Sequence, residues 1–395
     1  MERSLTLAIL PLAAFETLIW AATFYSFPAL LPVWETDMGW SRGEISGAMT
    51  ASMIATALAS PRMGSLIDRG HARAMLLGAT ALGAVLLVLL SMVQTLWQFW
   101  AVWIAIGLVN ACILYEACFA IITVTVGSRA KQAITVVTLM AGFAGTVCFP
   151  AFHVLSESMG WRFSLQVFAG VVLFICLPLA AWGMRAMEPF REPVPEATTP
   201  VGEARDEALR NPVFWWVAGG FAAMGLIHGM VISHIRPILA ECGLALTTAV
   251  LIASMMGPMQ VVGRVVMVAL GNRIDTFGAA VGSFVGVILG LLALLGGGVL
   301  PVLALIFVLP YSASYGIISI VRPVLAAEFL GRARFGVIAG MLALTYVLAS
   351  AFGPILSAVL WSLAGYDLVL GLSVVLVGVA LAGMFTARFQ VAQRG

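Results

Sequence analysis

Six ionisable side chains lie inside stretches of sequence that are otherwise apolar. Two are acids, two are histidines and two are arginines: Glu16, Glu116, His153, His228, Arg264 and Arg322. An arginine in such a place can bind an anionic group with its planar fork of donors, and a carboxyl group there can take up and release a proton as its surroundings change. These residue types therefore predict anion binding and proton exchange.

The elements that carry these side chains are predicted to be membrane-spanning helices. Of the 395 residues, 62% are hydrophobic and 10% are charged, and the mean hydropathy of +1.07 is far above that of a soluble domain. A helix needs roughly 20 apolar residues to cross a hydrocarbon core of about 30 Å. The sequence offers twelve such stretches: 6–32, 43–66, 74–94, 97–126, 132–157, 162–184, 213–240, 246–271, 278–298, 300–329, 335–362 and 367–387.

The two halves of the chain resemble each other. At a nearly constant offset of about 205 residues, GSLID (64–68) matches GNRID (271–275), SRAK (128–131) matches GRAR (331–334), Phe149-Pro150 matches Gly353-Pro354, and Gly160-Trp161 matches Gly365-Tyr366. We therefore expect an all-α integral membrane protein with two pseudo-symmetric six-helix bundles, 1–185 and 213–395. A solvated cytoplasmic linker, 186–212, joins them and contains a short helix near 203–210.

The basic residues predict the orientation in the membrane. With the N-terminus in the cytoplasm, fifteen of the 20 lysines and arginines fall on the inner side, three on the outer side and two within spans. We expect a multi-pass protein of a bacterial inner membrane with both termini in the cytoplasm, acting as a monomer. Since these residues set the topology, the net charge of +2 does not indicate a nucleic-acid partner.

Motifs for metals, cofactors and covalent chemistry are not found in the sequence. No pair of the five cysteines has a metal-ligand spacing, and no nucleotide-binding loop or nucleophile elbow is present. We therefore expect no metal, no cofactor and no enzymatic activity, and an ATP-driven pump has no support.

One loop motif carries a family resemblance. The stretch GSLIDRGHAR (64–73) resembles the loop between the second and third helices of the major facilitator superfamily. The resemblance implies that Gly64, Asp68, Arg69, Gly70 and Arg73 form a conformational latch, with Asp68 near a helix end of the other half and Asp275 as a weaker copy in the second repeat. The alternative is a topology signal with a turn at Gly70.

Within that superfamily the chain is similar to bacterial transporters related to monocarboxylate carriers. The resemblance rests on FP (27–28), GWSRGEIS (39–46), GWR (160–162), and Arg264 followed eight residues later by Asn272. The chain has Ala29 where these carriers have a lysine and Gln260 where they have an aspartate. In those carriers the lysine and the aspartate are implicated in handling protons and carboxylates, and this chain has neither group at these positions.

The distribution of ionisable residues agrees with the arrangement of the family. In that arrangement helices 1, 4, 7 and 10 line a central cavity, whereas helices 3, 6, 9 and 12, which contain no ionisable residue in their interiors, face lipid. We expect substrate binding by Arg264, with contributions from Arg322, His228, Gln260, Tyr25 and Tyr115, and proton coupling by Glu116 and Glu16. The alternative is that these acids and arginines are structural pairs that hold the halves together.

The function expected from these residues is secondary active transport. The substrate would be a small organic solute, an anion such as a monocarboxylate, moved by alternating access with coupled protons. A second reading is proton-driven efflux of a drug or toxic compound, although the glycine-proline motif of many drug exporters is not seen in GFAGTVCFPAF (142–152). A third is a transport-inactive sensor, which measured substrate flux would exclude.

Overall fold

The protein is built of helices that pack into two compact units. The computed structural model describes residues 4–193 and 200–393, and within these ranges it contains helices and turns but no strand. The first unit comprises Met1–Ala204 and Arg332–Leu344, and the second comprises Arg205–Gly331 and Thr345–Gly395. A short segment from the second half of the sequence therefore packs with the first half, while the domain limits expected at 185 and 213 stay predictions.

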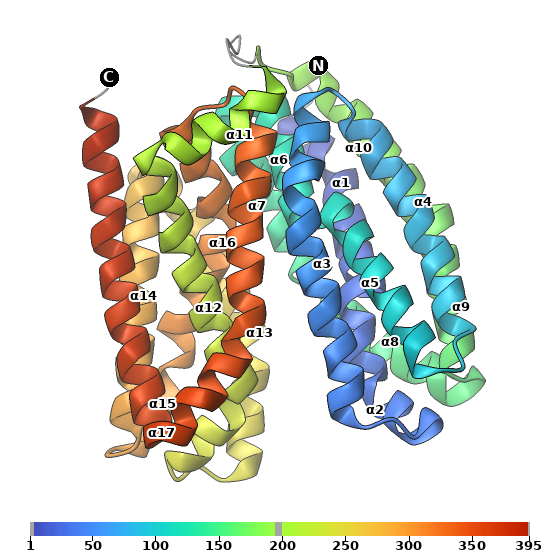
Figure 1. The fold of residues 1–395 in the computed structure, drawn as a ribbon, viewed down its shortest axis with the longest axis vertical. Helices are drawn as coiled ribbons and strands as arrows, with labels where there is room; N and C mark the ends of the chain where they lie inside the picture. Colours follow the sequence, from blue (N-terminus) through green and yellow to red (C-terminus); the bar gives the residue numbers. More distant parts are fainter. Residues whose placement is uncertain (1–3, 194–199, 394–395) are drawn as a thin grey trace. The chain divides into compact units, whose positions relative to one another are not determined.

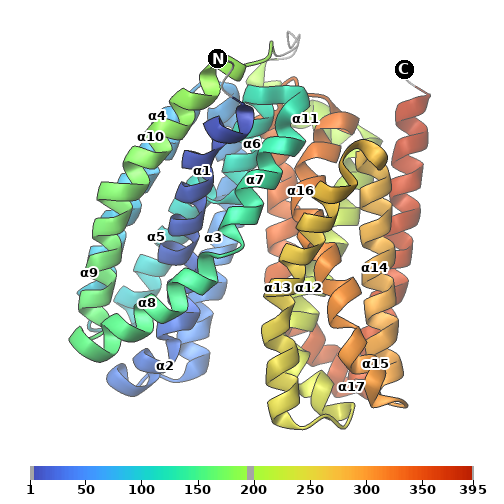
Figure 2. The same cartoon turned by 180° about the vertical axis from the view of Figure 1, so that it is seen from behind.

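The first unit contains the helices of the first half of the chain (Figure 1). They are α1 (Leu5–Trp20), α2 (Ser26–Met38), α3 (Arg42–Asp68), α4 (Ala72–Ser91), α5 (Leu96–Ile113), α6 (Tyr115–Val126), α7 (Ala130–Ala141), α8 (Ala144–Met159), α9 (Trp161–Val171) and α10 (Leu177–Met187). Wider π-helical turns, Ala21–Tyr25 and Val172–Cys176, join α1 to α2 and α9 to α10. In this unit α3 packs on α5, α1 on α7 and α10, and α4 on α5 and α9 (Figure 2).

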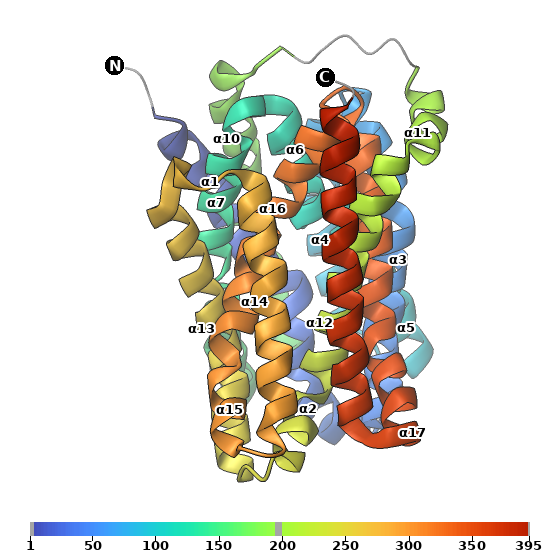
Figure 3. The ribbon, with the colours of Figure 1, turned by 90° about the vertical axis from the view of Figure 1, so that its left-hand side faces the viewer.

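The second unit begins within α11 (Val201–Arg210), the short helix expected in the linker. It contains α12 (Pro212–Glu241), α13 (Leu246–Leu270), α14 (Thr276–Gly297), α15 (Pro301–Ile306), α16 (Val308–Leu330) and the later part of α17 (Phe335–Ala392). Helices α13 and α14 both pack on α16 (Figure 3). The backbone of α17 leaves helical geometry at Ala364 and Gly365, which separates its two spans.

The helices account for the twelve expected spans. Nine stretches of the described residues are long and apolar enough to cross a membrane. Two of them, Leu96–Met159 and Phe335–Ala392, each contain two expected spans, and the more polar α3 supplies the twelfth. The prediction of an all-α integral membrane protein is confirmed.

The internal repeat is visible in matching contacts within each unit. Gly160 has a φ of +83° and Gly365 a φ of +70°, and an aromatic residue follows each of them. Trp161 donates from its indole nitrogen to Asp37 on α2 at 2.7 Å, and the Tyr366 hydroxyl lies 2.7 Å from Nδ1 of His234 on α12. In both units, therefore, the last span begins with a glycine and an aromatic residue that is tied to the first span.

A second matching contact is made by glycines. Gly107 on α5 lies so close to α3 that an added Cβ atom would overlap the backbone of Ser52. Gly316 on α16 lies equally close to the backbone of Gln260 on α13. Small residues allow membrane helices to approach in this way, so the second and fourth spans of each unit are packed through their backbones.

The helices expected to face lipid have large apolar side chains on their outer surface. Exposed examples come from α4, α10, α14 and the last part of α17: Leu82, Val85, Trp182, Val285, Leu289, Val375 and Val379. Such exposed apolar surfaces are suited to contact with lipid. In Figure 2, α4, α9 and α10 lie along one edge of their unit.

The GWR sequence at 160–162, which carried part of the family resemblance, forms a joint between helices. Nη1 of Arg162 donates to the carbonyl oxygens of Ser91 at 2.8 Å and Val93 at 2.9 Å, where α4 ends. Its guanidinium lies 4.3 Å from the centre of the Trp161 ring. A cation therefore satisfies the free carbonyl groups at a helix C-terminus.

Replacing Arg162 by alanine is expected to destabilise the first unit. Two charge-assisted hydrogen bonds and a cation–π contact are lost, for a reduction of about 2 kcal/mol in the free energy of unfolding. Thermal unfolding of the purified protein in detergent measures the effect. Arg62→Ala, which removes an exposed charge from α3, is the matched control. Equal melting temperatures for the two variants would contradict the assigned role.

Candidate functional site

The predicted latch residue Asp68 contacts the first turn of α17. Its Oδ1 accepts a hydrogen bond from the backbone N–H of Gly336 at 2.8 Å, and its Oδ2 accepts one from Val337 at 2.8 Å. Both partners belong to the segment Arg332–Leu344 that packs in the first unit. The carboxylate thus occupies the N-terminus of α17, where unpaired N–H groups and the helix dipole favour a negative charge.

Small residues bring α3 and the start of α17 into backbone contact. A Cβ atom on Gly64 would overlap the carbonyl group of Gly336, and one on Gly336 would overlap the carbonyl oxygen of Gly64. One helical turn away, Gly340 lies equally close to Ser60. Because each pair is four residues from the next, Ser60 and Gly64 face Gly340 and Gly336 along one seam.

The other residues of the motif have separate positions. Gly70 has a φ of +82° and ends α3 in a Schellman turn, with the N–H of His71 bonded to the Leu66 carbonyl at 2.9 Å. The Arg69 side chain is exposed, and Arg73 lines a cavity described below. In the second repeat, Asp275 accepts from the N–H of Gly278 at 2.8 Å and caps its own helix α14. Of the predicted set, the structure brings Gly64 and Asp68 to α17.

Replacing Asp68 by alanine is expected to loosen the first turn of α17. Loss of two charge-assisted acceptors leaves the N–H groups of Gly336 and Val337 without partners, so their amide exchange with deuterium should accelerate roughly tenfold or more. Exchange of these two amides in the purified protein is the measurement. Asp206→Ala, an exposed acid on α11, is the control, and unchanged exchange in Asp68→Ala would contradict the contact.

A cluster that the sequence did not predict fixes the start of the linker. Glu192 accepts from the backbone N–H of Ser128 at 2.8 Å and from its hydroxyl at 2.6 Å, and lies 3.1 Å from Arg332 and 3.6 Å from Arg129. We call Ser128, Arg129, Glu192 and Arg332 the linker clasp. Its hydrogen bonds from Ser128, aided by the two arginines, lower the pKa of the Glu192 carboxyl. The clasp therefore stays charged at pH values where an isolated glutamate begins to protonate.

The linker clasp adds fixed contacts at the beginning of the linker, which was expected to be solvated. Gly127, with a φ of +54°, allows the turn, and an added Cβ atom there would overlap the Glu192 and Arg332 side chains. The linker is thus held at its beginning, whereas its residues 194–199 lie outside the described ranges.

Glu16 is the more deeply buried of the two predicted proton-coupling acids. Its side chain on α1 is inaccessible to solvent. The side chains of Trp20 and Cys118 lie beside it. The π-helical turn Ala21–Tyr25 follows at once, and such turns are frequent at functional sites.

Glu116 lies at a break in the fourth span. The sequence predicted one continuous span, 97–126, but α5 ends at Ile113 and α6 begins at Tyr115, because Leu114 has an extended ψ of −177°. Glu116 is therefore in the first turn of a half-helix, where the dipole favours an acid. It lines a small cavity with Gly64 and Gly336, so it lies next to the seam between α3 and α17.

The predicted tyrosines of the first unit belong to one aromatic cluster. The ring of Trp20 lies 4.7 Å from Tyr115 and 6.1 Å from Tyr25, and the ring of Tyr115 stacks on Phe119 at 4.8 Å. Since Trp20 is also next to Glu16, this cluster brings Glu16, Tyr25 and Tyr115 into one region of the unit.

His228 lies in an aromatic environment in the second unit. Its ring is 4.2 Å from Tyr315 and 6.3 Å from Tyr311, and its Nδ1 has no hydrogen-bond partner among the described residues. The hydroxyl of Tyr315 donates to the carbonyl oxygen of Met224 at 2.8 Å. The tyrosine is thereby fixed against α12, and it holds one face of the histidine.

The two arginines of the second unit are buried. Arg264 on α13 is 5% exposed and Arg322 on α16 is 7% exposed. The Arg322 guanidinium lies 4.0 Å from the centre of the Tyr346 ring. Gln260 is half-buried one turn before Arg264. The predicted pairing of these arginines with Glu16 or Glu116 joins residues of different units and stays a prediction.

Among the described residues, no group of three His, Cys, Asp or Glu side chains is placed to hold a metal.

Comparison with known proteins agrees with the helical arrangement. A family model described as Major Facilitator Superfamily matches residues 12–354. The solved structure of FucP in the outward conformation aligns with a TM-score of 0.72 and 15% identity over 96% of this chain and 98% of that one. The structure of the proton:xylose symporter XylE bound to 6-bromo-6-deoxy-D-glucose aligns with a TM-score of 0.70 and 12% identity, over 97% of this chain and 96% of that one. The structure of the human organic anion transporter MFSD10 (TETRAN) aligns with a TM-score of 0.68 and 15% identity, over 97% of this chain and 100% of that one. No curated protein sequence matches the chain.

Proposed function

Because the chain belongs to the major facilitator superfamily, a family of membrane transporters rather than enzymes, we propose that it carries a small organic anion by proton-coupled alternating access. The substrate class that fits best is a monocarboxylate, in line with the bacterial carriers that the sequence resembles. We place the protein in a bacterial inner membrane with both termini in the cytoplasm, as the distribution of arginines favours. We also propose that it works as a monomer and as a symporter.

The burial of Arg264 and Arg322 is the observation that carries this proposal. Arg264 and Arg322 are only 5% and 7% exposed, and a buried guanidinium can bind a carboxylate through two N–H donors at once, away from competing water. Both arginines belong to the second unit, on spans that approach each other through Gly316 and Gln260. Gln260 and His228 could add neutral hydrogen bonds that distinguish one carboxylate from another.

Proton coupling is supported by the environment of Glu16. A charged carboxylate is costly in an apolar interior, and Glu16 is fully buried on α1, so exchange of its proton can be coupled to a change in its surroundings. Access of water or of a cation would favour release of the proton. Glu116, at the start of a half-helix beside the latch, is the second proton-coupling candidate.

The latch and the linker clasp would then control the transport cycle. Asp68 holds the first turn of α17, whose later residues belong to the second unit, and Glu192 holds Arg332 just before it. We propose that both contacts break when the binding site opens toward the cytoplasm.

Flux through the purified protein in proteoliposomes tests the proposal. Uptake of labelled monocarboxylates should follow an imposed pH gradient, with the acidic side as the source, and should collapse when a protonophore is added. Neutral sugars and cationic drugs are the comparison substrates. Gradient-driven accumulation of a cationic drug without carboxylate transport would support efflux instead, and no flux of any solute would support a sensor.

A further inference from the structure

A basic cavity lies in the first unit at the end that carries the latch. It has a volume of about 340 Å³, and is formed where α3 ends, α4 begins, and α6 meets α10. This size is in the range of cavities that hold small molecules or parts of larger ones. It is lined entirely by residues of the first unit and does not include Arg264, Arg322 or Glu16.

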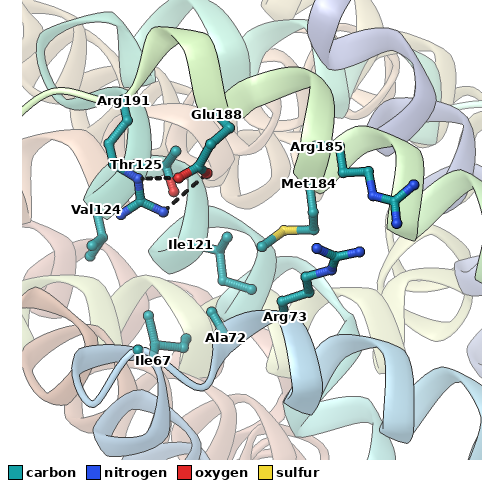
Figure 4. Close-up of a pocket in the computed structure, with 11 residues that line it drawn as sticks. Ile67, Ala72, Arg73, Ile121, Val124, Thr125, Met184, Arg185, Glu188 and Arg191 are labelled. Carbon is teal, nitrogen blue, oxygen red and sulfur yellow. Dashed lines mark hydrogen bonds and ion pairs between the residues drawn. The ribbon is translucent and has the colours of Figure 1, made fainter.

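The cavity is lined by more positive than negative side chains. Glu188 forms an ion pair with Arg191, with its two oxygens 2.8 and 3.2 Å from Nε and Nη2. Arg73 and Arg185 also line the cavity, and within the described part of the chain neither has an ion-pair partner. Figure 4 shows their guanidinium groups extending into the same side of the cavity, away from the Glu188–Arg191 pair. Two positive charges are therefore available for an anion.

Apart from Thr125, the uncharged residues of the lining are apolar or glycine. Ile67, Ile121 and Met184 contribute to the walls. Such a site suits an anionic group that is attached to a hydrophobic body, because two solvent-exposed arginines can bind the charge while the apolar walls contact the body.

The surface next to the cavity has the properties of a lipid-facing surface. Trp182, one turn before Arg185 on α10, is 61% exposed, and Leu82 and Val85 on α4 are 50% and 54% exposed. Helices α4 and α10 pack against each other, so these side chains continue the surface away from the cavity. A tryptophan beside an arginine at the end of a span is typical of the membrane interface.

From these features we propose that the cavity binds the phosphate group of an anionic phospholipid, with Arg73 and Arg185 on the phosphate and the acyl chains along α4 and α10. Basic cavities between membrane helices are suited to such headgroups. A zwitterionic choline lipid fits less well, because the acid that could hold its ammonium group, Glu188, is already paired with Arg191. The site is separate from the proposed transport site, and a bound lipid would connect the loop after the latch to α10.

Thermal unfolding in a neutral detergent tests this proposal. The probes are short-chain phosphatidylglycerol, phosphatidylcholine with the same chains, and inorganic phosphate. A ligand that binds only the folded protein raises its melting temperature with concentration. We expect phosphatidylglycerol to raise it at concentrations where the choline lipid and inorganic phosphate have little effect. In the double variant Arg73→Gln/Arg185→Gln, its apparent affinity should fall by about tenfold or more.

Controls separate this site from general attraction between charges. Arg62→Gln removes an exposed charge from the same unit outside the cavity and should keep the wild-type response. The single variant Arg185→Gln, outside the latch motif, should lose part of the response. Equal shifts with both lipids, or an unchanged response in the double variant, would overturn the proposal. An equal shift with inorganic phosphate would also overturn it, since the site would then serve a soluble phosphate compound.

Discussion

Replacing Arg264 by alanine is expected to abolish carboxylate transport and to weaken substrate binding between about ten- and a hundredfold. Arg264 is 5% exposed, so its proposed hydrogen bonds to an anion would form away from water, where each charge-assisted bond is worth about 1.5–3 kcal/mol. Equilibrium binding of the substrate to the purified variant is the measurement. Arg264→Lys should recover little, because an ammonium group cannot reproduce the bidentate geometry.

The matched control for this experiment is Arg273→Ala. Arg273 is an exposed arginine of the same unit, so its loss removes a charge without emptying a buried site. The melting temperature of each variant shows whether it is folded. Substrate affinity that is unchanged in a folded Arg264→Ala protein would contradict the binding role and would favour a structural role for this arginine.

Replacing Glu16 by glutamine is expected to separate substrate movement from proton movement. The substitution keeps the shape of the side chain but removes its titration, so an imposed pH gradient should no longer drive accumulation. In the wild type one pH unit is worth about 1.4 kcal/mol, or tenfold accumulation for each coupled proton. Exchange of labelled for unlabelled substrate across the membrane should continue, because it needs no net proton transfer.

The same substitution at Glu116 distinguishes between the two acids. Both variants are compared in one assay of pH-driven uptake and one of exchange. Normal pH-driven uptake in Glu16→Gln together with its loss in Glu116→Gln would transfer the proton-coupling role to Glu116. Normal uptake in both variants would show that neither carboxyl group carries the coupled proton.

The spans were predictable because about 20 consecutive apolar residues leave few alternatives to a membrane helix. The break at Leu114 was not, since no proline or glycine stands there and the residues around it are compatible with a continuous helix. The π-helical turn Ala21–Tyr25 likewise has no sequence signal.

Contacts between distant segments were predictable only in part. The motif pointed to Asp68, but not to the N–H groups of Gly336 and Val337, which lie far along the chain. A signal for this seam was present in the four-residue spacing of Ser60 with Gly64 and of Gly336 with Gly340. For Glu192 there was none, because an acid in a proline-rich linker is ordinarily solvated.

The position of the first turns of α17 has a consequence for how the polypeptide can be divided. Arg332–Leu344 is encoded in the second half of the sequence but packs with the first unit, where Gly336 and Gly340 cover Gly64 and Ser60. A chain cut in the linker would therefore leave the N-terminal fragment with an open groove along α3, and the C-terminal fragment would carry the piece that fills it. The two fragments would then be complementary, because each contributes one side of the seam between α3 and α17.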